Sequence, residues 1–303
     1  NEPNWKIVAI SRSPSTTHPL TKLPNVEFAK GNVEDLSSCQ EVTKDADMVY
    51  ATLGLPKYER AYWAKHWPVA VDNLLKVTSA DRPLVFCDNL YAYGPSTNMN
   101  SKSPTIKASL NTKPQIRALC REAMRKRMEE SPGAITVVGG SDFYGPTVED
   151  SKSYLNGTVI HKIVQGQSPM ALGTSKAIHD FCYATDFSNA LYVVSKNPKI
   201  SMGKFWICPH SIRGKSVNDI VKTVAGKLGM KKAPGVQVLP GWMIPLLGLF
   251  DSMIKELREM MPQWQNDYSV DDSEFIEAFG VKATPYEETL DKTIAHFKDA
   301  QKK

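Results

Sequence analysis

A short segment rich in polar and phenolic side chains follows an apolar run in the first third of this chain. The segment Asp88-Asn-Leu-Tyr-Ala-Tyr-Gly94 comes directly after Pro83-Leu-Val-Phe-Cys87. An amide can polarise a carbonyl oxygen by hydrogen bonding, and a phenol can also carry a proton. Asn89 and Tyr91 are therefore the first candidates for chemistry on a carbonyl or hydroxyl group.

The apolar run before this segment predicts a short strand that is buried on both faces. Gly94-Pro95, a pair typical of turns, closes the polar segment. In an open parallel sheet, ligands bind outside the carboxyl ends of the strands. The segment is therefore predicted to form a wall of the active site.

Strand and helix patterns alternate along the first half of the chain. Short apolar runs predict strands at residues 5–10, 26–29, 46–51, 83–88 and 134–138. Apolar residues at helical intervals predict helices at residues 60–79 and 111–130. Strands and helices that alternate in this way form βαβ units. The predicted fold is an α/β doubly wound parallel sheet with helices on both faces.

The composition is that of an ordinary globular protein, with 303 residues, 42% hydrophobic and 23% charged. The net charge of +5 is spread over scattered lysine and arginine runs, which favours solvated helix faces over a nucleic-acid surface. The five cysteines are odd in number and far apart, and neither they nor the six histidines show metal-ligand spacing. No metal is expected, and a reducing compartment is favoured.

No membrane partner is expected either. The most apolar window, Val238 to Phe250, is too short for a membrane span and contains Pro240 and Pro245. No targeting segment is visible at the amino end. These features predict a cytosolic protein.

Four segments, in order along the chain, resemble the extended short-chain dehydrogenase/reductase superfamily in its NAD(P)-dependent epimerase/dehydratase branch. They are Asp88–Gly94, Ser141–Pro146, Ile178–Asp186 and Ala283–Leu290, which together extend over most of the chain. The first is similar to the segment in which the family's catalytic Ser or Thr precedes Val-Tyr-Gly. The second is similar to the cofactor-side loop that ends in Tyr-Gly-Pro.

The resemblance implies a Rossmann-like fold, a nicotinamide cofactor and a small-molecule substrate with a hydroxyl or carbonyl group, such as a sugar derivative. It also implies a homodimer through the two helices that follow the third and fourth predicted strands. Near residue 150 the helices and strands become shorter and are separated by Gly, Pro and Ser. Residues 1–150 are therefore expected to form the dinucleotide-binding core, and residues 151–303 to add the last core strands and a smaller substrate lobe.

The resemblance also implies that the cofactor meets residues at the carboxyl ends of successive strands. Ser11 and Arg12 lie where family members that favour NADP carry a cation for the 2′-phosphate, whereas NAD enzymes carry Asp or Glu. NADP is thus the expected cofactor, with NAD as the alternative. Further cofactor contacts are expected from Asn32, Val33, Thr52, Leu53, Gly54, Ser141 and Phe143. The alternative for Arg12 and Asn32 is an ordinary solvated strand end or turn.

Two features of the family are missing. The first is the Gly-rich turn, Gly-x-x-Gly-x-x-Gly, which occurs nowhere in the sequence. In the family this turn lets backbone N–H groups approach the pyrophosphate. We therefore expect a first strand, this turn and its helix to precede residue 1, which would make the sequence a fragment of a longer chain.

The second missing feature is the family's Tyr-x-x-x-Lys, because the corresponding window, Asn111-Thr-Lys-Pro-Gln-Ile-Arg117, has no tyrosine. Lys113 and Arg117 lie one helical turn apart in this window. Arg117 could hold the ribose, and Lys113 could move a proton if burial desolvates it. Asn89 stands in place of the catalytic Ser or Thr, and Tyr91 is the preferred replacement phenol.

Two functions remain open from the sequence. The first is an NAD(P)-dependent oxidoreductase or epimerase that acts on a hydroxyl or carbonyl of a small molecule, with Tyr91 or Lys113 handling the proton. The second is an NAD(P)-binding sensor or scaffold that has lost catalysis, as the missing Tyr-x-x-x-Lys indicates. The polar cluster at one strand end favours the enzyme, because a sensor needs no such wall.

Overall fold

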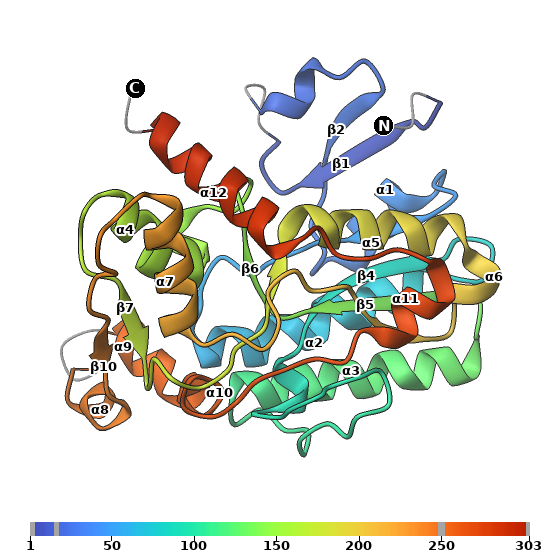
Figure 1. Cartoon of the computed structure of the whole chain (residues 1–303). Helices are drawn as coiled ribbons and strands as arrows, with labels where there is room; N and C mark the ends of the chain where they lie inside the picture. Colours follow the sequence, from blue (N-terminus) through green and yellow to red (C-terminus); the bar gives the residue numbers. More distant parts are fainter. Residues whose placement is uncertain (1–3, 15–17, 248–251, 301–303) are drawn as a thin grey trace.

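Four parallel strands form the central sheet of the structure, a computed structural model that describes residues 4–14, 18–247 and 252–300 (Figure 1). They lie in the order β3 (Val49–Ala51), β4 (Leu84–Asn89), β5 (Ile135–Gly140) and β9 (Phe205–Ile207). Every ladder between them is parallel. β4 and β5 consist mainly of apolar residues because both faces of the sheet are covered by other elements.

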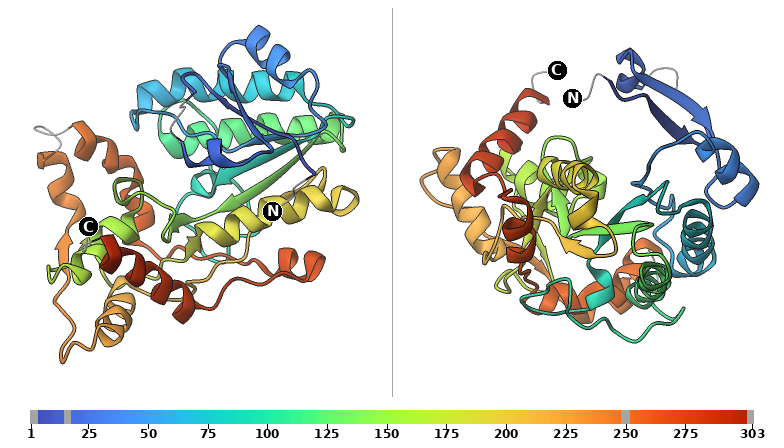
Figure 2. Two further views of the ribbon diagram at one scale, coloured as in Figure 1. Left: turned by 90° about the horizontal axis from the view of Figure 1, so that it is seen from above. Right: turned by 90° about the vertical axis from the view of Figure 1, so that its right-hand side faces the viewer.

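Helices cover both faces of this sheet (Figure 2). On one face, Leu84 and Phe86 share an apolar core with two helices, α2 (Arg60–Val77) and α3 (Lys113–Glu130). On the other face, Val85 packs against a group of helices that includes α5 (Ala184–Lys196) and α11 (Ser273–Phe279). This alternation follows from the strand geometry, in which successive side chains point to opposite faces. The short helix α6 (Pro198–Ser201) lies with α5 on the second face. The predicted α/β architecture with parallel strands is confirmed.

A separate two-stranded ribbon precedes the central sheet in the chain. β1 (Ile7–Ser11) pairs in parallel with β2 (Val26–Lys30), and the short 3-10 helix η1 (Pro19–Lys22) lies between them in sequence. Both strands were expected in one sheet with the others, but among the described residues the ribbon shares no ladder with β3. Figures 1 and 2 show the ribbon set apart from β4 and β5, and α1 (Leu36–Thr43) follows it in the chain.

The second half of the chain builds a lobe around its own apolar core (Figure 1). Two short parallel pairs lie in it: β6 (Asp142–Tyr144) with β8 (Phe181–Tyr183), and β7 (Met170–Leu172) with β10 (Gln237–Leu239). Its helical segments are η3 (Asp150–Lys152), η4 (Leu155–Ile160), α4 (His161–Val164), α7 (Val217–Lys227), η5 (Gly241–Met243), α8 (Ile244–Leu247), α9 (Ser252–Leu257), η6 (Arg258–Met260), α10 (Met261–Gln265) and α12 (Tyr286–Ala300).

The apolar window that begins at Val238 is divided among β10, η5 and α8, and its last residues, 248–250, lie outside the described ranges. Across the described part of the chain, every helix falls short of the length and apolar character that a membrane crossing needs. All five cysteines are free thiols.

Candidate cofactor and active site

A cavity of about 530 Å³ lies where β1, β2 and β3 end. Its lining joins three segments that are distant in sequence, because each of them follows directly after one of these strands. The predicted cofactor residues in the lining are Ser11, Arg12, Asn32, Val33, Thr52, Leu53 and Gly54. We refer to it below as the larger cavity.

The charged residues in the lining of the larger cavity are Arg12 and Glu34. Glu34 Oε2 lies 2.6 Å from His66 Nδ1, so this carboxylate already has a partner. Arg12 is exposed and, among the described residues, has no ion-pair partner. Its guanidinium therefore remains able to bind an anionic group such as a phosphate.

Gly31 allows the β1–β2 ribbon and α1 to approach one another beside the larger cavity. A Cβ at Gly31 would lie 2.6 Å from Ile10 Cγ2 of β1, which is closer than side chains tolerate, and 3.2 Å from Val42 Cγ1 of α1. The next residue, Asn32, donates its backbone N–H to Ser38 Oγ (3.0 Å), and its Oδ1 accepts from the N–H of Glu34 (3.2 Å). These bonds fix the turn that holds Asn32 at the cavity.

Asp88, near the end of β4, organises the polar segment that follows. Its Oδ1 accepts a hydrogen bond from the backbone N–H of Asn89 (2.9 Å) and another from Arg117 Nη2. Asn89 Oδ1 in turn accepts from the backbone N–H of Tyr91 (3.1 Å). The turn into the 3-10 helix η2 (Tyr91–Tyr93) is therefore held by side chains of the strand end itself.

The sequence predicts Arg117 at the cofactor ribose, but the structure places its guanidinium in the interior. Arg117 is 1% exposed and is ion-paired with Asp88. Burial alone would lower the pKa of Arg117, but the charge and hydrogen bond of Asp88, together with the nearby Cys120 and Cys87, outweigh burial and hold the pKa above its ordinary value. Arg117 does not line the larger cavity, because α3 turns this face toward the sheet. Its ribose contact stays a prediction.

Lys113, one turn earlier on α3, is also enclosed. Its side chain is fully buried, and Nζ donates to Glu256 Oε2 (2.7 Å) and to the carbonyl of Glu256 (2.9 Å), and ion-pairs with Glu259. Burial alone would raise the pKa of Glu256, but the hydrogen bonds and charges of Lys113 and Arg60 together outweigh burial and lower that pKa. Nζ also lies 4.6 Å from the centre of the Tyr58 ring. The geometry thus holds the Lys113 amine between two carboxylates and beside a phenol, and its proton-carrying role stays a prediction.

Tyr91 lines a smaller cavity of about 270 Å³, which also includes Gln263 and Glu259. Its ring stacks on Trp63 (6.4 Å between centroids), and its hydroxyl is hydrogen-bonded to Tyr58. Burial is the main reason why the pKa of Tyr91 lies well above its ordinary value. Tyr91 is therefore a neutral phenol at physiological pH, suited to donating a hydrogen bond.

Tyr58 and the pair Asp142–His179 are polar groups of this region that sequence reasoning missed. His179 Nε2 lies 2.8 Å from Asp142 Oδ2 because β6 and β8 pair in parallel with Asp142 opposite Phe181. Asp142 could have been predicted, because it lies just after the carboxyl end of β5, where ligands bind in a parallel sheet. The sequence carries no signal for its partner, since that depends on how β6 pairs.

Ser141 and Phe143, predicted at the cofactor, take part in internal packing. Ser141 Oγ donates to the carbonyl of Asp180 (2.6 Å), and its backbone N–H donates to His210 Nε2 (3.0 Å). The ring of Phe143 lies edge-on to Phe187 at 4.8 Å. Neither residue lines either cavity, so their cofactor contacts remain predictions.

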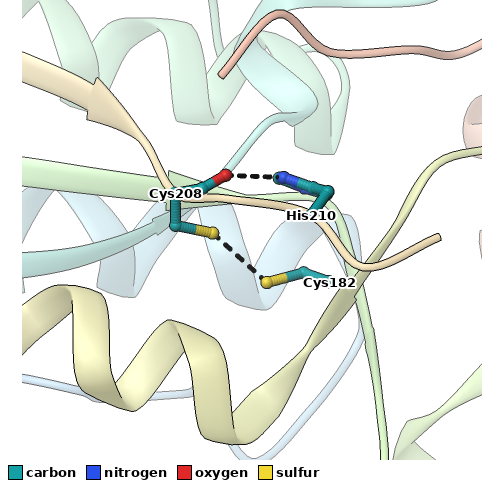
Figure 3. A group of neighbouring side chains, drawn as sticks. All are labelled: Cys182, Cys208 and His210. Carbon is teal, nitrogen blue, oxygen red and sulfur yellow. Dashed lines mark hydrogen bonds between the residues drawn. The ribbon is translucent and has the colours of Figure 1, made fainter. Parts of the chain in front are cut away.

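Three potential metal ligands lie together in the interior: Cys182, Cys208 and His210 (Figure 3). The two sulfurs are 3.2 Å apart. His210 Nδ1 donates to the carbonyl of Cys208 (2.7 Å), and Nε2 accepts from Ser141, so neither ring nitrogen has a lone pair left for an ion. Burial raises the pKa of the Cys208 thiol well above its ordinary value and lowers that of His210 to about 4. The cluster is explained by internal hydrogen bonding.

Comparison with known proteins connects this geometry to a family. Residues 1–205 match the sequence profile of the NAD dependent epimerase/dehydratase family. No curated protein sequence matches the chain. At 15% identity or less, the structural matches below show the fold alone.

The chain is similar to dTDP-glucose 4,6-dehydratase from Bacillus anthracis in complex with NAD, with a TM-score of 0.75, 15% identity and coverage of 99% of this chain and 90% of that one. It is similar to UDP-glucose 4-epimerase from Thermotoga maritima with UDP-glucose, with a TM-score of 0.74, 15% identity and coverage of 99% and 93%. It is also similar to UDP-glucuronic acid 4-epimerase from Bacillus cereus in complex with NAD, with a TM-score of 0.72 and 14% identity. That match covers 98% of this chain and 92% of the epimerase.

Proposed function

The chain belongs to the NAD dependent epimerase/dehydratase family, and from this premise we propose that the larger cavity holds the adenosine end of its nicotinamide dinucleotide. One observation carries the proposal: seven residues predicted at the cofactor, from three separate strand ends, line this single cavity. Apolar strand residues such as Val8 and Val49 offer a surface for adenine. The exposed cation of Arg12 suits a ribose 2′-phosphate, so we propose NADP as the preferred cofactor and NAD as the alternative.

The enzyme is of the short-chain dehydrogenase type, and the cofactor, when bound, accepts and returns a hydride. We propose that Asn89 polarises the substrate oxygen. Its Oδ1 is used by the N–H of Tyr91, and its Nδ2 has no partner within the described residues. Tyr91 donates or takes back the proton on that oxygen, with Lys113 as the competing candidate.

The substrate we propose is a small polar molecule with a hydroxyl or carbonyl group, such as a sugar derivative. The smaller cavity, about 270 Å³, lies below the range of roughly 300–1,000 Å³ typical of drug-sized ligands. It therefore suits a molecule of monosaccharide size. The dehydratase and epimerase that resemble the chain in fold act on nucleotide sugars, so sugar nucleotides belong in the test panel.

We further propose that residues 1–150 form the cofactor-binding core and that residues 151–303 add β9 to its sheet and form the substrate lobe. A homodimer through α2 and α3 is proposed as well, and Val69 of α2, 43% exposed, offers an apolar contact there. Five free thiols suit a reducing compartment, and we propose a cytosolic location.

One experiment separates the enzyme from a sensor that has lost catalysis, an alternative that no comparison favours. The chain is titrated with NADPH and NADH by fluorescence, and absorbance at the nicotinamide band then follows a panel of aldoses, ketoses and sugar nucleotides. We expect binding and turnover. Binding without turnover on the whole panel would support the sensor, and no binding would contradict both.

A further inference from the structure

His179 is held in a fixed orientation beside the strand ends. It is 3% exposed, and its ring stacks on those of Trp264 (4.3 Å between centroids, 6° between planes) and Tyr268 (4.9 Å, 20°). Nε2 lies 2.8 Å from Asp142 Oδ2. Nδ1 is buried and has no hydrogen-bond partner among the described residues. Buried polar atoms without a partner are uncommon and call for an explanation.

Asp142 has one oxygen engaged and one oxygen free. Oδ2 accepts from His179 and from Gln263 Nε2 (3.3 Å), whereas no described residue donates to Oδ1. The Asp142 side chain is 17% exposed, unlike the enclosed imidazole. Gln263 also lines the smaller cavity, together with Tyr91. The carboxylate therefore lies next to the place where we propose the substrate binds.

Two other histidine–carboxylate pairs exist among the described residues, and they differ from this one. His161 and Asp150 form a more exposed pair (26% and 37%), and His161 Nε2 also has a partner, Gln165 Nε2 at 2.9 Å. His66 pairs with Glu34 at the larger cavity. Neither of these histidines has a buried ring nitrogen without a partner. Pairing with a carboxylate therefore does not by itself explain why His179 has a buried ring nitrogen without a hydrogen-bond partner among the described residues.

Epimerisation or dehydration next to a carbonyl begins when a proton leaves the neighbouring carbon. The base that takes this proton must be a different group from the one bonded to the carbonyl oxygen. Tyr91 is proposed at that oxygen, so a reaction of this kind needs a second proton carrier beside the smaller cavity.

We propose that Asp142 is this second acid–base residue and that His179 is the positioning residue that holds its carboxylate; this rests on the proposed function. The C–H bond next to the carbonyl breaks, its proton moves to Asp142 Oδ1, and its electron pair forms a C=C bond while the carbonyl oxygen takes the negative charge. Asn89 and Tyr91 hydrogen-bond that oxygen. Return of the proton restores the carbonyl, so no oxidant or reductant is consumed in this step.

Other titratable groups face this pair. Four phenols interact electrostatically with Asp142, and two further groups with His179. They are Tyr58, Tyr91, Tyr154 and Tyr268 toward Asp142, and Asp180 and His210 toward His179.

The test uses small ketoses, because they already contain the carbonyl and need no hydride transfer. Dihydroxyacetone, erythrulose and fructose are incubated with the chain in D₂O, with and without NADPH, and proton NMR follows loss of the C–H signals beside the carbonyl. We expect exchange above the buffer rate. Asp142→Asn should lower the exchange rate by a factor on the order of 10². Asp150→Asn, which changes the carboxylate of the more exposed pair with His161, should leave the exchange rate unchanged.

His179→Gln should change the pH profile of the exchange rather than abolish it, and ¹⁵N NMR of the histidine side chains should show His179 protonated at Nε2. Circular dichroism and NADPH titration check that each variant is folded. Equal exchange by wild type and Asp142→Asn would overturn the proposal, and so would the absence of exchange above buffer with all three ketoses. NADPH binding and sugar oxidation, measured separately, show whether the proposed function has failed as well.

Discussion

The guanidinium carbon of Arg117 lies 4.0 Å from the centre of the Trp67 ring, and the same guanidinium is ion-paired with Asp88. All three residues are at most 4% exposed. A planar cation can stack on an aromatic ring with its face and bond a carboxylate with its edge. The unit joins α3, α2 and β4 directly behind the strand end that carries Asn89 and Tyr91.

Arg117→Met should lower the free energy of unfolding by about 3–5 kcal/mol, the usual effect of removing one partner of a buried ion pair. Asp88 would remain buried with Arg121, whose Nη1 is 3.8 Å from Asp88 Oδ2, too far for a hydrogen bond. Urea unfolding followed by circular dichroism measures the change. Lys126→Met, which removes an exposed pair with Glu130, is the control and should have no measurable effect. A loss no larger than the control's would show that Arg117 does not stabilise Asp88.

Tyr91→Phe should slow turnover by a factor on the order of 10², as expected for a positioned proton carrier. NADPH affinity should not change, because Tyr91 lines the smaller cavity and not the larger one. Tyr93→Phe, in the same turn, is the matched control: its hydroxyl bonds Arg121, so stability should fall while turnover per folded molecule stays constant. Equal turnover in wild type and Tyr91→Phe would move the proton role to another group.

Lys113 is the competitor in that experiment, and the structure dictates how it must be tested. Lys113→Met alone would leave Glu256 and Glu259 without their cation. A loss of turnover could then come from lower stability rather than from a missing proton carrier. The variant is therefore combined with Glu256→Gln and Glu259→Gln. If the triple variant turns over as wild type does, Lys113 carries no proton.

The strand ends could be predicted from the sequence because short-range patterns determine them. The apolar run before Asp88 forms β4. The residues that follow β1, β2 and β3 line one cavity, as expected for the carboxyl ends of parallel strands. What could not be predicted is how distant segments pair. Glu256 lies 143 residues after Lys113, and nothing in the helical pattern of α3 indicates which carboxylates reach it.

The same limit explains the remaining differences. Arg117 has the spacing of a cofactor contact, yet its direction depends on α3 packing against β4, where Asp88 meets it. His179 lies beside Asp142 because β6 pairs with β8. Each of these strands has only three residues, too few for the sequence pattern to predict that they pair. Separation of the β1–β2 ribbon from β3 is likewise a property of the tertiary structure.

His210 should make the protein less stable as pH falls. Its pKa is lowered to about 4 in the fold, mainly by burial, whereas an unfolded histidine titrates near 6.5. Below about pH 6.5 the unfolded chain binds a proton that the folded chain refuses, so the unfolding free energy falls as pH is lowered from 6.5 to 4, by about 3 kcal/mol in total. Above 6.5 the group has no effect.

Urea unfolding between pH 7.5 and 4.5 measures this slope in wild type, in His210→Gln and in His296→Gln, an exposed histidine. His210→Gln should be less stable at pH 7.5 because it loses the bonds to Ser141 and Cys208, but its pH slope should be smaller. The raised pKa values of buried Asp180 and Asp272 act in all three proteins and cancel in the comparison. A slope unchanged by His210→Gln would contradict the assignment.

Arg12 should set the choice between the two nicotinamide cofactors. It is the cation in the lining of the larger cavity, and the other charged residue there, Glu34, is engaged by His66. Arg12→Ala should therefore raise the Kd for NADPH about tenfold, or about 1.4 kcal/mol, and leave the Kd for NADH unchanged, since only NADPH carries the 2′-phosphate. Because Arg12 is exposed, the preference should also shrink as salt is raised. Lys30→Ala, an exposed cation at the end of β2 outside the lining, controls for net charge and should affect both cofactors equally and weakly. Equal affinity of the wild-type chain for NADPH and NADH would remove the basis for preferring NADP and would leave Arg12 as an ordinary solvated strand-end residue.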